Sequence, residues 1–234
     1  MNLHLAVMAI FVCGLPVQAQ IPDVLKGLGG HRDNSNGTVA SGLKEALEVG
    51  TKNTVAQTGV TDGFFRNEAI KILLPEKLRP IEKGLRLAGQ GQKVDDFVLS
   101  MNRAAEKATP AASSIFREAI TKMTFEDARK ILSGGDTAAT AYFKDKTSDQ
   151  LRTAFRPPVK AAMDETGVVQ QYKAMTGQLS SLPFARGQSF DLDEYVVTKT
   201  LDGLFYVLGQ EEKKIRTNPA AQVTPLLRQV FGSR

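Results

Sequence analysis

Three polar residues in the stretch MNRAAEKA, residues 101–108, have the types and the spacing that carboxylate chemistry would require. Asn102 and Glu106 are four residues apart, so on a helix they are neighbours on one face, with Arg103 beside them. A glutamate in a helical cleft can act as a general acid if burial raises its pKa. Glu106 is therefore the candidate catalytic residue, and Asn102, Arg103 and Glu106 are candidate binding residues.

Three interpretations of this polar face stay open. It can be a solvated face with an internal ion pair, a second packed face with a buried polar network, or the wall of a ligand pocket. If Met101 points at the core, Leu99 falls among the polar residues, which favours a helix packed on two sides. The small side chains Ala104, Ala105 and Ala108 on the other face would let a neighbour approach closely, so we expect this helix to run through the middle of the fold.

The stretch EEKKIR, residues 211–216, offers a second candidate binding site in Lys213, Lys214 and Arg216. Its acids precede its bases, which also suits ion pairs within one helix and the helix dipole. The net charge of +5 is compatible with an anionic partner, such as a component of the cell envelope, without requiring one. The basic residues are dispersed and no aromatic residues interleave with them, so we expect no nucleic-acid binding.

The first nineteen residues, MNLHLAVMAIFVCGLPVQA, have the pattern of a secretory signal peptide. The uncharged run from Leu3 to Leu15 is shorter than the roughly 20 residues of a membrane span. Small residues precede the expected cleavage site after Ala19. We therefore predict a soluble protein that is periplasmic or secreted.

Cleavage would also remove most of the residues that commonly bind metals or act as nucleophiles. The chain contains one cysteine, Cys13, and two histidines, His4 and His31, and only His31 lies beyond the cleavage site. A disulfide, a thiol nucleophile and a multi-histidine metal site are then excluded. We expect no metal and no cofactor.

The stretch SGGDTAATAYF, residues 133–143, looks at first like a phosphate-binding loop, but it lacks the lysine that follows the last glycine of such loops. We interpret it as a turn between two helices. Gly134 is expected to end the first helix in a left-handed conformation. Asp136 is expected to cap the second, where its carboxylate would repel a phosphate.

Apolar residues recur at helical spacing along most of the chain, which predicts an all-α fold. We expect a single compact bundle of about nine or ten helices over residues 38–234, after a signal peptide at 1–19 and a flexible leader at 20–37. Pro157 and Pro158 should kink or end one helix, and Asp191 should cap the longest one, which runs to about Arg216. No later uncharged stretch approaches the length of a membrane span.

Together these landmarks resemble a bacterial family known only as domain of unknown function 4197. The resemblance covers about residues 39–232 and rests on the blocks GLKEAL, DGFF, KILLPEKLRPIE, MNRAAEKA, FREAITKMTFEDARKIL, GGDTAATAYF, YVVTKTLDGLF and EEKKIRTNPAA. It implies a helical protein exported mostly in Gram-negative bacteria, with no assigned activity and no functional residues to carry over.

Two functions follow from the residues. The first is a non-catalytic binding or envelope-interaction protein whose partner is unknown. The alternative is a carboxylate-dependent hydrolase or lyase that acts on an envelope polymer through Glu106. An open cleft with Glu106 at its floor would favour the enzyme, and a closed ion pair between Glu106 and Arg103 would favour the binding protein.

Overall fold

The structure, a computed structural model, describes residues 31–165 and 191–222, together with Pro225 and Arg228. No strand occurs among these residues, so the predicted all-α class is confirmed. The α-helices are α1 (His31–Thr58), α2 (Arg79–Leu87), α3 (Gly91–Ala108), α4 (Ala112–Lys122), α5 (Phe125–Ser133), α6 (Ala138–Glu165) and α8 (Leu192–Thr217). Short 3₁₀ turns lie at η2 (Glu76–Leu78), η3 (Thr109–Ala111) and η4 (Pro219–Ala221).

The expectation of nine or ten helices is wrong for the described residues, and α6 shows why. Ser148 is of a residue type that often caps a helix, but it lies inside α6, where its hydroxyl donates to the carbonyl of Lys144. Pro157 and Pro158 lie within the same helix and do not end it. Phe155 and Val159 on either side of them are fully buried, and we attribute the continuity of α6 to this packing, which compensates for the lost backbone hydrogen bonds.

In the N-terminal region the described residues begin at His31, so the predicted signal peptide at residues 1–19 lies outside them. Helix α1 begins at His31, so residues 31–37 are helical although they were expected to belong to a flexible leader. The described residues contain no helix that combines the length and the apolar character needed to cross a membrane.

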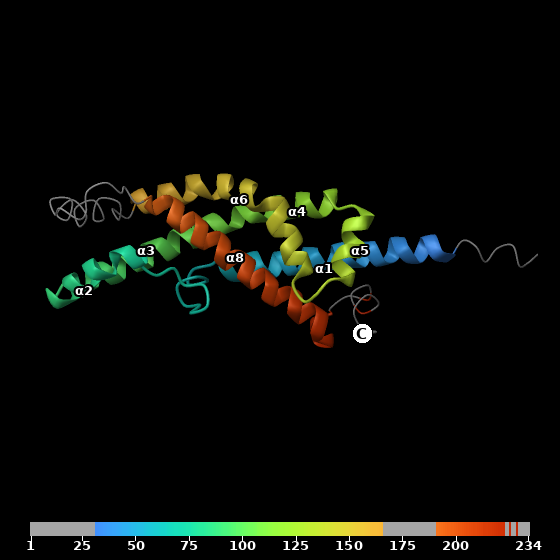
Figure 1. Ribbon diagram of the computed structural model, residues 1–234, viewed down its shortest axis with the longest axis horizontal. Helices are drawn as coiled ribbons and strands as arrows, with labels where there is room; N and C mark the ends of the chain where they lie inside the picture. Colours follow the sequence, from blue (N-terminus) through green and yellow to red (C-terminus); the bar gives the residue numbers. More distant parts are fainter. Residues whose placement is uncertain (1–30, 166–190, 223–224, 226–227, 229–234) are drawn as a thin grey trace, which may run out of the picture.

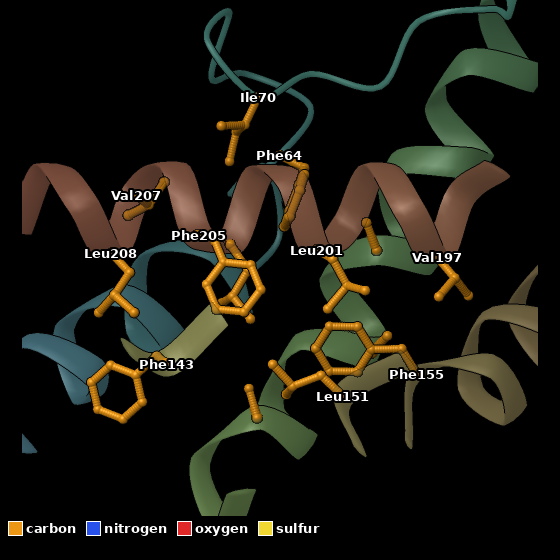
Figure 2. Packing of buried hydrophobic residues seen from close by; sticks show 14 of the residues in the cluster. Phe64, Ile70, Phe143, Leu151, Phe155, Val197, Leu201, Phe205, Val207 and Leu208 are labelled. Carbon is orange, nitrogen blue, oxygen red and sulfur yellow. The ribbon is translucent and has the colours of Figure 1, made fainter. Parts of the chain in front are cut away.

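Helix α8 forms the centre of the hydrophobic core (Figure 2). In that view Phe64 and Ile70 lie on one side of α8, and Phe143, Leu151 and Phe155 of α6 lie on the other. Gly203 permits the first of these contacts, because a Cβ atom there would stand 2.6 Å from Phe64 and 3.1 Å from Ile70. The segment between α1 and α2 therefore packs directly on the backbone of α8.

The molecule is elongated, with the α2–α3 hairpin at one end and the start of α1 at the other (Figure 1). Gly89, with a φ of 74°, makes the turn between α2 and α3, as its place after an apolar run predicts. Between α1 and α2 the chain crosses α8 and α3 as a non-helical segment, residues 59–75. In this segment Ile70, Ile72 and Leu74 are buried and Leu73 is exposed, the alternation that an extended backbone produces.

Candidate functional site

Asn102 holds the non-helical segment by its backbone. Its side-chain oxygen accepts a hydrogen bond from the N–H of Ile72 (2.8 Å), and its amide donates to the carbonyl of the same residue (2.9 Å). The amide also donates to the carbonyl of Val98 within α3 (2.7 Å). Asn102 is fully buried, and its one side chain satisfies both backbone polar groups of the buried residue Ile72, as a neighbouring strand would.

Glu106 holds the same segment one helical turn further along α3. One carboxylate oxygen accepts from the N–H groups of Phe64 (3.0 Å) and Phe65 (3.1 Å). The other accepts from the guanidinium of Arg103 (2.6 Å), which also bonds to Asp62 (2.6 Å). The carboxylate is engaged on both oxygens, and only 4% of its side chain is exposed.

The second face of α3 is therefore packed, in agreement with the buried-network interpretation of Asn102 and Glu106. Arg103 lies at the rim of this network, with 31% of its side chain exposed. Burial alone would lower the pKa of Arg103, but the hydrogen bonds to Glu106 and Asp62 raise it above its ordinary value. The guanidinium is thus charged at every relevant pH and closes the network toward the solvent.

A second carboxylate, Glu212 of α8, binds the start of the helix that follows the glycine-rich turn at residues 133–137. It accepts hydrogen bonds from the N–H groups of Ala139 and Thr140 (2.8 Å each) and from the Thr140 hydroxyl (2.8 Å). These donors belong to the first turn of α6, where an anion is favoured by the free N–H groups and the helix dipole. A carboxylate does occupy the position that a phosphate would take, but it comes from α8.

Two expectations about this turn need correction. Asp136 is exposed, and Glu212 rather than Asp136 satisfies the N–H groups at the start of α6. Gly134 has an extended conformation with a φ of −81°, not a left-handed one. A Cβ atom at Gly134 would lie 2.5 Å from the Cβ of Ala138, so the glycine is required for close approach of the two helices.

The basic cluster of α8 does not share one face. The guanidinium of Arg216 bonds to Glu212 (2.8 Å) and to the carbonyl of Ile131 (2.9 Å), and only 7% of this side chain is exposed. Lys213 is exposed, and the ammonium of Lys214 lies 3.6 Å from Glu211. Burial thus separates Arg216 from the two lysines, which remain accessible.

Among the described residues, a large surface depression forms a groove that the sequence did not indicate. It holds about 730 Å³ and lies between residues 69–79 and one face of α8. This "69–79/α8 groove" is lined by Ala69, Ile70, Lys71, Leu73, Leu74, Pro75, Glu76, Lys77, Arg79, Tyr195, Lys199, Asp202, Gly203 and Tyr206. Its volume falls within the range of about 300–1,000 Å³ that is typical of ligand sites.

A hydrogen bond joins the two walls of this groove, and large apolar side chains are exposed in it. The Tyr195 hydroxyl donates to the carbonyl of Leu73 (2.9 Å), and burial raises the pKa of Tyr195, so the phenol stays protonated. The side chains of Leu73 and Tyr206 are 56% and 48% exposed. Large apolar side chains in one open groove are typical of interaction surfaces.

Comparison with known proteins gives one result. The family model described as a protein of unknown function, DUF4197, matches residues 33–232. The chain belongs to this family. No curated protein and no solved structure matches the chain.

The described residues of this DUF4197 chain contain no cluster of metal-binding side chains. Within residues 31–165 and 191–222, no three His, Cys, Asp or Glu side chains gather in a way that could hold a metal ion. The buried acids instead bind protein N–H groups. Glu211, next to Glu212, accepts from the side-chain amides of Asn53 and Gln57 on α1 (3.0 Å each).

Proposed function

We propose that this chain is an exported, non-catalytic binding protein that recognises an anionic component of the cell envelope. The 69–79/α8 groove carries the proposal, because it is open and its lining contains four basic and two acidic side chains. The ion pairs within the lining are loose. The Lys199–Asp202 and Arg79–Glu76 pairs are separated by 3.4 and 3.6 Å. An anionic ligand can therefore replace these contacts at small cost.

The state of Glu106 argues against the alternative hydrolase or lyase. A general acid must present its proton to the substrate at hydrogen-bond distance. Both oxygens of Glu106 instead accept hydrogen bonds from Phe64, Phe65 and Arg103, and the side chain is buried. This is the closed ion pair that favours a binding protein over an enzyme.

Export is supported by the sequence of the first nineteen residues and tested by the location of the native protein. We expect the protein in the periplasmic or secreted fraction of its own cell, with Gln20 as its first residue. Cell fractionation followed by N-terminal sequencing checks this. A cytoplasmic protein that retains Met1 would contradict the proposal.

Substitutions at two pairs of lysines test which basic surface binds the ligand. Thermal shift and co-sedimentation with polygalacturonate and with phosphatidylglycerol vesicles measure binding to anionic envelope-like probes. The double variant Lys71→Glu/Lys199→Glu alters the groove, and Lys213→Glu/Lys214→Glu makes the same charge change elsewhere. We expect at least a tenfold loss of affinity in the first variant and less than a twofold change in the second.

The reverse result would place the ligand on Lys213 and Lys214, the surface suggested by the sequence. Equal losses in both variants would mean that only net charge matters, and the groove would lose its role. Absence of binding to any anionic probe by the unmodified protein would overturn the binding function itself.

A further inference from the structure

The wall of the groove contributed by α8 is a regular stripe. Tyr195, Lys199, Asp202 and Tyr206 follow one another at intervals of four, three and four residues, so they share one face of the helix. With a rise of about 1.5 Å per residue, the stripe from Tyr195 to Tyr206 is about 16 Å long. A ligand that contacts the whole stripe is therefore elongated.

The opposite wall is the non-helical segment, and the interior of the protein holds it in place. Asn102 binds both backbone groups of Ile72, and the hydroxyl of Tyr195 binds the carbonyl of Leu73. Because Ile72 and Leu74 point inward, the side chain of Leu73 points outward. The groove is thus preorganised, so binding of a ligand does not lose conformational entropy in ordering this wall.

The chemistry of the lining combines two requirements. The exposed apolar surface of the groove comes mainly from Leu73 and Tyr206, with a smaller part from the half-buried Tyr195. The basic side chains Lys71, Lys77, Arg79 and Lys199 lie among them. A complementary ligand must carry negative charges and apolar groups along the same short length.

We propose that the groove binds an extended, acidic segment of a partner polypeptide, with apolar side chains between its carboxylates. This inference rests on the proposed binding function and names the class of its ligand. An extended peptide rises about 3.3 Å per residue, so about five residues match the stripe. Exposed tyrosine, arginine and leucine side chains suit a protein partner, because aromatic residues and arginine supply much of the energy of protein interfaces.

Two other anionic ligands fit the lining less well. A glycan exposes mainly hydroxyl groups, which the exposed side chain of Leu73 cannot bind by hydrogen bonds. A lipid requires an enclosed space for its acyl chain, whereas this depression is open to solvent. The mixed, open lining favours a polypeptide.

A direct test uses the purified protein and a fluorescein-labelled octapeptide of alternating glutamate and leucine. We expect the fluorescence anisotropy to rise with protein concentration, and the affinity to fall at least tenfold when glutamine or lysine replaces the glutamates. Lys199→Glu should weaken binding at least tenfold and Tyr206→Ala at least fivefold. Lys213→Glu is the matched control, an exposed lysine on the same helix outside the groove, and should change the affinity less than twofold.

Further outcomes separate this inference from the proposed function. If Lys199→Glu weakens binding of polygalacturonate or of phosphatidylglycerol vesicles and the peptide does not bind, the polypeptide inference is overturned and the anion-binding function stands. If the peptide binds equally to all variants, the groove is not its site, and the inference fails. If no probe binds, the inference and the proposed function fail together.

Discussion

Glu106 on α3 and Glu212 on α8 each bind two consecutive backbone N–H groups of a distant segment, but in different surroundings. Glu212 binds the first turn of α6, where the helix dipole adds to the attraction, and its partner Arg216 is buried. Glu106 binds a non-helical turn at Phe64 and Phe65. Its partner Arg103 is partly exposed.

A buried carboxylate that binds backbone N–H groups therefore has a different role in each of the two regions. Around Glu212 the hydrogen bonds join α6 to the part of α8 that lies outside the groove, so we expect them to contribute to stability alone. Around Glu106 and Asn102 the hydrogen bonds hold the non-helical segment, residues 59–75, which continues into the wall of the 69–79/α8 groove. The second network therefore supports a surface as well as a fold, and substitutions should distinguish the two regions.

The largest effect is expected at Arg216. Arg216→Ala would leave Glu212 buried without its cation, and removing one partner of a buried ion pair costs about 3–5 kcal/mol. Urea unfolding measures the loss, with Lys213→Ala on the same helix as an exposed control near zero. A loss below about 1 kcal/mol would show that solvent reaches the pair.

Asn102→Ala should follow. It leaves the N–H and the carbonyl of Ile72 unsatisfied, and each such buried group costs about 1–3 kcal/mol. Because water can enter the space left by the shorter side chain, we expect a total in the lower part of that sum, about 2–4 kcal/mol. The control is Ser100→Ala, because the Ser100 hydroxyl bonds only within α3, to Asp96. Limited trypsin digestion should also show faster cleavage at Lys71 in Asn102→Ala. Unchanged cleavage would contradict the role of Asn102 in holding the groove wall.

Arg103→Ala should cost less than Arg216→Ala, about 1–2 kcal/mol. Its side chain is about one third exposed, so solvent screens part of the interaction with Glu106 and Asp62. Parallel urea titrations of both variants give the comparison directly. Equal losses would mean that the two regions do not differ in the way their burial indicates.

The smallest effect is expected at Asp136. Since Glu212 satisfies the start of α6, Asp136→Ala is a surface substitution and should change stability by no more than about 0.5 kcal/mol. A loss near 1 kcal/mol, as for a true capping residue, would restore the interpretation of Asp136 as the cap. Thermal or urea unfolding suffices for the measurement.

Local patterns in the sequence predicted part of the local structure. Asp191 caps α8, as predicted, by accepting from the N–H of Glu194, and Thr124 and Asp127 form a capping box of the usual spacing at the start of α5. Leu99 correctly suggested that the polar face of α3 is packed. These features depend on residues within a few positions of one another, which is the range over which helix periodicity and capping act.

Features that join distant segments could not be predicted in this way. The capping of α6 by Glu212 joins residues that are more than 70 positions apart, and an amphipathic pattern does not say which helix lies opposite. The groove arises in the same manner from residues 69–79 and α8. Its only sequence signal is the presence of Leu73 and Tyr206 at outward positions of their segments, which is too weak to identify a site.

The central position of α8 has a consequence for the newly made chain. Glu211 bonds to a residue 158 positions earlier, Tyr195 to one 122 positions earlier and Glu212 to one 73 positions earlier. Until residues 192–217 have left the ribosome, α1, α3 and α6 lack the surface of α8 against which they pack. Because contacts between distant residues form late and slowly, we expect the fold to be completed only after most of the chain has been made. A chain that has not completed its fold can pass a narrow translocation pore, so this order of the helices is compatible with the export that we propose.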